Sequence, residues 1–273
     1  MNAIIIAVTL CYILSAIGYL AYLIRQNTYW YRAGFYVLIL GVLLHTIWIG
    51  YGTIKAGHLP VHNLRETLSI AAWAITCLFV ILQTRYQLKI LGAFASPLAA
   101  VIMIVSLQLP SQTTYSSPAF SSLWLYFHIV TVFLGDAAFA LASGAGIFYL
   151  VQEQAIKNKT PGFFYRRLPS LEFIDATGYA CIVVGFTLLT IGLITGFAYA
   201  KTVWGRFWSW DPKEIWSGIA WLLYAALLHA RISMGWRGRK AALMAIIGFG
   251  VLMFTFFGVN FLLKGHHGEF TRW

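Results

Sequence analysis

The stretch Trp204-Gly-Arg-Phe-Trp-Ser-Trp-Asp-Pro-Lys-Glu-Ile-Trp216 places four tryptophans and a phenylalanine within thirteen residues. Long apolar segments flank it on both sides, over about 171–200 and 214–234. One interpretation is an interfacial belt, in which Trp rings anchor helix ends at the level of the lipid head groups. The other is a platform for a large flat aromatic ligand, with Arg and Lys available for its carboxylates. A belt does not require Asp-Pro-Lys-Glu at fixed spacing, so the pattern favours the platform.

The composition is that of an integral membrane protein. Of the 273 residues, 60 % are hydrophobic and only 10 % are charged, whereas soluble domains carry about 25 % charged residues. The 19 Lys and Arg residues outnumber the 8 acidic ones, but they lie in short runs between apolar segments, which is typical of loops at an anionic membrane face and not of a nucleic-acid-binding surface. The three cysteines lie inside apolar segments without CxxC pairing, which indicates packing residues and no thiol redox activity.

A helix needs about 20 mostly apolar residues to cross a bilayer. Eight segments meet this requirement, and their continuous apolar character predicts helices and not the short alternating strands of a barrel. The predicted spans are 2–24, 33–54, 66–84, 89–109, 123–152, 171–200, 214–234 and 242–264. The expected fold is an all-α integral membrane protein made of one polytopic domain over 1–273. The first span has no cleavage site, so we expect it to be retained.

The distribution of Lys and Arg predicts the orientation in the membrane. Loops after the first, third, fifth and seventh spans hold 12 of these residues and the opposite side holds 7. By the positive-inside rule both termini lie on the outer (periplasmic or lumenal) side, together with the Trp-rich motif in the loop 201–216 between the sixth and seventh spans. Asp211-Pro212 reads as the start of the seventh helix, with Glu214 in its first turn.

Histidines cluster on the predicted outer side. His128 falls near the outer end of the fifth span, His266 and His267 follow the eighth, and His58 and His62 lie between the second and third spans. A lone histidine in a membrane protein is most often a packed, hydrogen-bonded side chain. As a set, however, histidines on the fifth and eighth helices could supply two axial imidazoles to a haem iron held against the Trp platform.

Other ionisable residues lie deeper or leave alternatives open. His45 and His229 could form a second, deeper pair, since an ionisable residue within a span is a functional hypothesis by default. Zinc is the competing metal, and it would require three or four ligands, for which Glu66 or Glu269 could serve. Asp136 lies about two turns beyond the outer histidine of the fifth span. It could either hydrogen-bond a helix neighbour or line a cavity.

The Trp-rich stretch resembles the WWD signature of haem-handling membrane proteins, in the form WGxxWxWDPKExW that is typical of the CcsA/ResC branch of system II cytochrome c biogenesis. The resemblance extends over most of the chain from the second span onward. Further matching pieces are Gly57-His-Leu-Pro60 followed by Asn63 and Glu66, the run Gly192–Gly196, and Phe257–Leu263 followed by His267.

This resemblance implies a function. Such proteins carry haem b, with reduced iron, from the cytoplasmic side to an outer WWD site and, with a ResB/CcsB-like partner, present it to the CxxCH motif of an apocytochrome c. The chain would then be a subunit of a holocytochrome c synthase (haem lyase) complex that depends on a thiol-reducing system. We expect it in a bacterial cytoplasmic (inner) membrane, with a thylakoid as the alternative. The competing function is that of a CcmC-like haem-release component of an ABC-linked exporter without ligation activity, against which the eight spans and the DPKE sequence argue.

The resemblance also implies roles for residues. His128 and His267 would be the outer axial ligands of the haem iron, although His266 adjoins the latter and either could ligate. His229 would be a deep ligand, and His45 is a further candidate for a deep site whose second ligand could come from the partner. The remaining haem contacts are expected from Trp204, Trp208, Trp210, Trp216, Asp211 and Arg206. No catalytic acid or base is expected, because positioning of vinyl and thiol supplies the rate effect.

Overall fold

The structure, a computed structural model, describes residues 2–86, 88–110, 122–159 and 162–259. Within these ranges eight helices are long and apolar enough to cross a membrane, which confirms the predicted number. The helices are α1 (Asn2–Arg25), α2 (Thr28–Ala56), α3 (Leu64–Tyr86), α4 (Gly92–Gln108), α5 (Leu123–Lys157), α6 (Leu171–Trp204), α7 (Pro212–Ser233) and α8 (Arg239–Met253). A short 3₁₀ turn, η1 (Lys89–Leu91), leads into α4, and a π-helical turn, η3 (Phe254–Gly258), continues α8.

The connection between the sixth and seventh helices is shorter than the sequence predicts. The helix α6 continues through Trp204 and ends at Gly205, whose φ of 72° lies in the left-handed region that glycine adopts without strain. The next helix begins at Pro212, a favoured first helical residue. The non-helical connection is therefore 205–211 and not 201–216, and Trp204 and Trp216 belong to helices.

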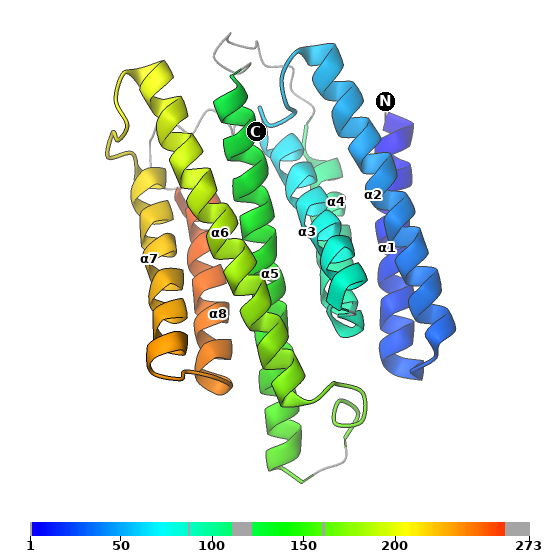
Figure 1. Cartoon of the computed structure of the whole chain (residues 1–273). Coiled ribbons are helices and arrows are strands. Elements are labelled where there is room, and N and C mark those ends of the chain that lie inside the picture. Colours follow the sequence, from blue (N-terminus) through cyan, green and yellow to red (C-terminus); the bar gives the residue numbers. More distant parts are fainter. Residues whose placement is uncertain (1, 87, 111–121, 160–161, 260–273) are drawn as a thin grey trace.

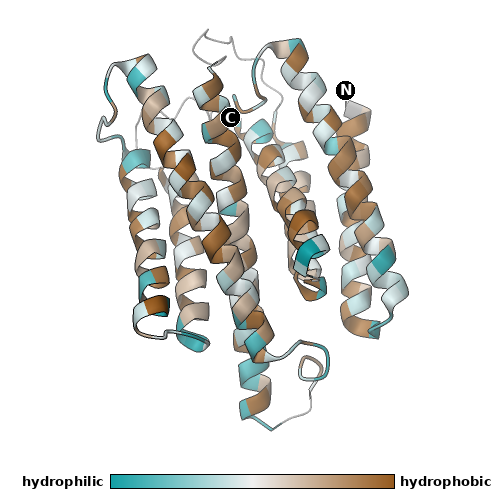
Figure 2. Cartoon of the chain, viewed as in Figure 1, coloured by the Kyte–Doolittle hydropathy of each residue, from teal (hydrophilic) through white to brown (hydrophobic). Residues whose placement is uncertain are grey.

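The helices form one bundle in which the fifth and sixth are central (Figure 1). In this view α7 and α8 lie on one side of that pair and α1 and α2 on the other, with α3 and α4 between. Hydrophilic residues gather in the loops and at the helix ends, whereas the middle of the bundle is apolar (Figure 2). At their lower ends, α5 and the start of α6 project beyond the other helices (Figure 1).

The most extensive helix contact joins α5 to α6. Small residues allow the two backbones to approach closely, as is common between membrane helices, where lipid supplies no hydrophobic driving force for association. A Cβ atom at Gly185 would lie 2.8 Å from the Cε1 atom of Phe139 and 3.1 Å from the carbonyl oxygen of Gly135. The fully buried Phe139 ring therefore occupies the space that a side chain at residue 185 would need.

We expect Gly185→Val to separate α5 from α6 and to lower the free energy of unfolding by about 1–3 kcal/mol, the usual cost of overpacking. Thermal melting of the detergent-solubilised protein measures the effect. Gly250→Ala is the matched control, because no atom lies within 4 Å of a Cβ there and alanine favours a helix. Equal melting temperatures for the two variants would contradict this account of the helix contact.

Candidate functional site

A cavity lies among α5, α6, α7 and the end of α8, with the start of α3 closing a further side. Its empty volume, including the open mouth, is about 1350 Å³. Most of its lining is apolar or aromatic, contributed by residues such as Leu125, Ile129, Phe133, Leu193, Phe197 and Phe256. The cavity therefore suits a mostly apolar ligand.

The ionisable side chains of the lining come from two helices. His128 and Asp136 belong to α5, and Lys213 and Glu214 belong to the first turn of α7. The eight residues between the α5 pair correspond to about 12 Å along the helix. The cavity lining thus combines an ammonium group, an imidazole and two carboxyl groups.

Hydrogen bonding fixes the orientation of the imidazole of His128. Its Nδ1 atom lies 2.7 Å from the carbonyl oxygen of Gly192 on α6, and since a carbonyl can only accept, Nδ1 carries the proton. A metal would then be bound through Nε2, the arrangement found in metal-binding histidines whose second nitrogen donates to a carbonyl. A Cβ at Gly196 would lie 2.7 Å from Nδ1, so the absence of a side chain at this residue makes room for the ring.

Two tryptophans of the motif lie on or beside the cavity. Trp204, the last residue of α6, lines it. Trp208 packs edge-on against Phe197, with 5.8 Å between ring centroids, and its indole Nε1 is buried without a hydrogen-bond acceptor among the described residues. A buried, unsatisfied donor costs about 1–3 kcal/mol, which makes this N–H a candidate contact for a ligand or partner.

The other two tryptophans lie elsewhere. Trp210 is 75 % exposed, and its φ of 59° is an uncommon, left-handed conformation for a bulky residue. Trp216 lies within α7 and packs on Phe254, with ring centroids 4.6 Å apart. Arg206 is also exposed. Within this chain, the four tryptophans of the predicted platform therefore do not form one surface. One lines the cavity, two are packed against phenylalanines, and Trp210 faces outward.

A capping box holds the loop in this conformation. The Asp211 side chain accepts from the backbone N–H of Lys213 at 2.9 Å and caps α7. The Glu214 carboxylate accepts from the backbone N–H of Asp211 at 3.2 Å and from both the N–H and the hydroxyl of Ser209 at 2.8 Å. These bonds flank residue 210 on both sides and explain how its strained conformation is maintained. Asp211, predicted as a cofactor contact, has this structural role.

Two buried polar groups, one in the cavity lining and one on α7, have no partners among the described residues. The Oδ1 atom of Asp136 and the hydroxyl of Tyr224 are buried and make no hydrogen bond within the described part of the chain. Of the two roles open to Asp136, the structure shows the cavity-lining one. The Tyr224 ring is stacked on Phe139 at 3.6 Å, so its hydroxyl cannot easily turn away. Buried groups of this kind call for a ligand or water to complete their hydrogen bonds.

His45 lies outside this cavity in a buried polar network. Its Nδ1 atom is 3.1 Å from the Tyr12 hydroxyl and its Nε2 atom is 2.9 Å from the Ser69 hydroxyl. Thr76 donates in turn to the Tyr12 oxygen at 2.9 Å. Both ring nitrogens therefore have partners, and the network ties α1, α2 and α3 together.

The remaining predicted ligands are not brought together with His128. His229 is exposed near the C-terminal end of α7, far along the helix from the cavity. His266 and His267 lie outside the described residues. Within the described ranges no group of three or more His, Cys, Asp and Glu side chains is arranged to hold a metal ion. A haem needs only axial ligands from the protein.

The sequence made the Lys of the motif available for the carboxylates of a ligand, and this residue is Lys213. It lines the cavity beside Glu214 and Ser217.

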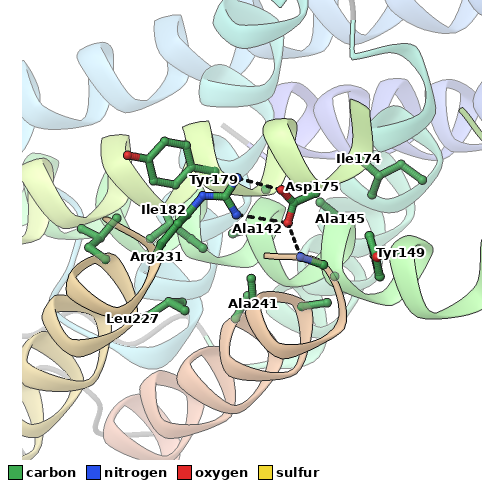
Figure 3. Close-up of a pocket in the computed structure, with 16 residues that line it drawn as sticks. Ala142, Ala145, Tyr149, Ile174, Asp175, Tyr179, Ile182, Leu227, Arg231 and Ala241 are labelled. Carbon is green, nitrogen blue, oxygen red and sulfur yellow. Dashed lines mark hydrogen bonds and ion pairs between the residues drawn. The ribbon is translucent and has the colours of Figure 1, made fainter. Parts of the chain in front are cut away.

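A second, small pocket lies at the opposite end of α5 to α8 (Figure 3). There the Asp175 carboxylate accepts two hydrogen bonds from Arg231, at 2.7 and 3.1 Å, and one from the backbone N–H of Gly238 at 2.8 Å. The Arg231 guanidinium also lies over the Tyr179 ring, 4.3 Å from its centroid. These contacts fasten α6, α7 and the start of α8 to one another.

We expect Asp136→Leu to raise the free energy of unfolding of the ligand-free protein by about 1–3 kcal/mol, because it removes a buried polar group that lacks a partner. The open cavity leaves room for the larger side chain. Asp136→Asn, which keeps a polar group, should produce a smaller change. Melting temperatures measure both, and a decrease for the leucine variant would contradict the assignment of an unsatisfied carboxyl.

A histidine pair in the loop 57–63 gives a pH-dependent stability. His62 Nε2 and His58 Nδ1 are 2.7 Å apart, and burial, followed by the neighbouring His58, lowers the pKa of His62 from 6.5 to about 4. Between these values the unfolded chain binds more protons than the folded one, so this contribution to stability is complete above pH 6.5 and is lost as the pH falls toward 4. We expect His62→Gln to flatten the pH dependence of the melting temperature in this window. An unchanged profile would contradict the prediction.

Comparison with known proteins places the chain among cytochrome c assembly proteins. The family model described as "Cytochrome C assembly protein" matches residues 61–267. The CcsA cytochrome c biogenesis protein of Prochlorococcus marinus (strain MIT 9301) is 37 % identical over 254 residues, covering 85 % of this chain and 82 % of that protein. The CcsA protein of Guillardia theta is 34 % identical over 281 residues, covering 92 % and 93 %.

A solved structure shares the fold. The cytochrome c haem lyase CcmF superposes with a TM-score of 0.61 at 15 % sequence identity, covering 98 % of this chain and 48 % of that one. The chain thus corresponds to about half of the larger protein, and the similarity concerns the helical arrangement alone. Together with the sequence relatives and the matched family model, the WWD motif and its capped loop lead to one assignment: the chain is a multi-pass membrane protein of the cytochrome c assembly family, in its CcsA/ResC branch.

Proposed function

We propose that the chain takes haem b as its cargo, holds it in the cavity described above and presents it to the CxxCH motif of an apocytochrome c, together with a ResB/CcsB-like partner. The observation that carries this proposal is His128. Its Nδ1–H is donated to Gly192 at 2.7 Å, so that Nε2 is the coordinating nitrogen, and the ring lines a large apolar cavity whose wall includes a tryptophan of the motif.

The residues of the cavity fit a haem. The apolar and aromatic lining suits the porphyrin faces, and one axial ligand comes from His128. The Lys213 ammonium group lines the same cavity and can pair with a propionate carboxylate. From the family resemblance we assign the second axial ligand to His267.

The chemistry requires positioning above all. In thioether formation the sulfur of a Cys thiol bonds to the inner carbon of a haem vinyl and the thiol hydrogen goes to the outer carbon, so no net electrons are exchanged. The iron stays reduced, and a thiol-reducing system keeps the CxxCH cysteines available. The protein contributes by holding the vinyl groups where the thiols can reach them. The histidine of CxxCH can then replace one axial imidazole and release the product.

We infer that a deep haem site involves the partner. His229 is exposed at the surface of α7, where a ligand from the ResB/CcsB-like protein could face it. Coordination by His45 would break its hydrogen bond to Tyr12 or to Ser69 in a buried network, which favours His229 as the deep ligand. The exposed Trp210 and Arg206 lie in the loop that faces the acceptor and the partner.

The orientation follows from the charge distribution of the loops. The cavity lining includes Trp204 and Lys213 on either side of the Trp-rich loop, which the positive-inside rule assigns to the outer side. We place the protein in a bacterial cytoplasmic membrane, with its haem site facing the compartment in which cytochrome c matures.

The first test is an absorption spectrum of the protein co-purified with its partner, with and without dithionite. Sharp reduced haem bands are expected for the unmodified protein. We expect His128→Ala to lower haem retention by at least about tenfold. Removing even a residue that only hydrogen-bonds a metal ligand lowers metal affinity by about tenfold or more, and this variant removes the ligand itself. Added imidazole should restore the spectrum.

Two further variants sharpen the result. Gly196→Ala places a methyl group against the His128 ring and should weaken haem binding without removing the ligand, whereas His58→Ala, outside the cavity, should leave the spectrum unchanged. Bound haem with an identical spectrum in His128→Ala would overturn the assignment of the ligand. Absence of haem from every form, even with the partner, would overturn the function.

A further inference from the structure

A second polar site lies far from the haem cavity, between the start of α2 and the end of α3. An open groove of about 680 Å³ runs there, bounded by the first turns of α2 (Thr28, Tyr31, Arg32, Phe35), the last turn of α3 (Gln83, Thr84) and Lys89 of η1. It shares no lining residue with the haem cavity, and its chemistry is independent of haem.

The groove is cationic. Arg32 and Lys89 line it and no acidic residue does. The Arg32 guanidinium is exposed and has no hydrogen-bond or ion-pair partner among the described residues. The Lys89 ammonium lies over the Tyr31 ring, 5.1 Å from its centroid, and is thereby held at the groove. Two cations that line one groove without a carboxylate suit a phosphate group.

A buried amide adds a second feature. Gln83 is only 2 % exposed. Its Nε2 donates to the Tyr31 hydroxyl oxygen at 2.7 Å, while its Oε1 is buried and without a partner. Because the Tyr31 oxygen accepts this bond, its own hydrogen is left to donate elsewhere. The wall therefore offers one acceptor, Gln83 Oε1, beside one donor, the Tyr31 hydroxyl. An alcohol hydroxyl, which both donates and accepts, can pair with both groups, whereas a phosphate group can only accept.

The place of the groove in the membrane points to the source of the ligand. It lies at the helix ends that the positive-inside rule assigns to the inner leaflet, where anionic lipids attract basic side chains. Phe35 and the Tyr31 ring supply an apolar border beside the cations. A headgroup with attached acyl chains would satisfy both kinds of contact.

We propose that this groove binds an anionic phospholipid with a hydroxylated headgroup, of which phosphatidylglycerol is the simplest. The phosphate pairs with Arg32 and Lys89, and a glycerol hydroxyl donates to Gln83 Oε1 while accepting from Tyr31. Bound lipid then joins the start of α2 to η1 and the end of α3.

The experiment measures lipid binding to the full chain in detergent by native mass spectrometry, with phosphatidylglycerol, phosphatidylethanol and phosphatidylcholine as probes. Phosphatidylethanol carries the same charge as phosphatidylglycerol but lacks the headgroup hydroxyls. The unmodified protein should bind phosphatidylglycerol most tightly. Arg32→Gln/Lys89→Gln should weaken this binding by about 30-fold, since each basic residue near a lipid phosphate contributes about a factor of five.

The matched control is Arg85→Gln/Arg166→Gln, which removes two exposed charges from the same side of the protein but outside the groove. An equal loss in both double variants would show general charge attraction only and overturn the site. Melting temperatures of the variants verify that they are folded.

Gln83→Leu tests the hydroxyl contact separately. It should reduce affinity for phosphatidylglycerol to that for phosphatidylethanol and leave the latter unchanged. A preference for phosphatidylglycerol that survives this substitution would overturn the role of the amide. If soluble glycerol phosphate bound as tightly as the lipid, the ligand would be a free phosphoester and the lipid assignment would be wrong.

Discussion

The close approach of α5 and α6 is the constraint on which the geometry around His128 depends. The same contact that packs Phe139 against Gly185 continues outward to Gly192 and Gly196, where it brings a backbone carbonyl to the imidazole of His128. A carbonyl in a helix is a rigid acceptor, so the orientation of the ring follows from helix packing and not from loop conformation. Membrane helices reach such distances only where small residues line the contact. The glycines of α6 thus serve stability and ligand geometry together.

In the WWD loop, the carboxylates and the tryptophans have different roles. Its carboxylates, Asp211 and Glu214, satisfy backbone N–H groups at the start of α7 and hold the loop shut over a few residues. Because the carboxylates satisfy these backbone N–H groups, the tryptophan side chains are not needed for capping and can form contact surfaces. Trp204 lines the cavity, Trp208 is packed with an unsatisfied N–H, Trp210 projects outward and Trp216 packs on Phe254. The motif therefore combines a helix start with four tryptophans in different surroundings.

Sequence patterns predicted the helices well because a membrane span depends on a long apolar run, which is a local property. The helix start at Asp211-Pro212 was equally local and is confirmed by the capping box. The extension of α6 to Trp204 was missed because aromatic residues at an interface resemble a loop boundary when only hydropathy is considered.

The site was harder to predict, since it depends on contacts between distant segments. No periodicity shows that both nitrogens of His45 are engaged by Tyr12 and Ser69, which lie in other helices. The orientation of Lys213 into the cavity, the unpaired carboxyl of Asp136 and the outward position of Trp210 all follow from tertiary packing. The choice of His128 depended on the resemblance to a family as much as on its position, and its hydrogen bond to Gly192 became visible only in the structure.

The large cavity beside the Trp-rich loop and the small pocket around Asp175 both lie among α5 to α8, but they are not connected through a shared lining residue. The eleven residues from Leu125 to Asp136, the first and last α5 residues of the larger cavity's lining, correspond to about 16 Å along α5, roughly half of a hydrocarbon core of about 30 Å. The buried Ala137 and Ala138 follow on α5, the smaller pocket begins at Ala142, and the two linings share no residue. Among the described residues, the larger cavity and the smaller pocket are thus separate spaces, so a substitution in one lining leaves the other lining intact.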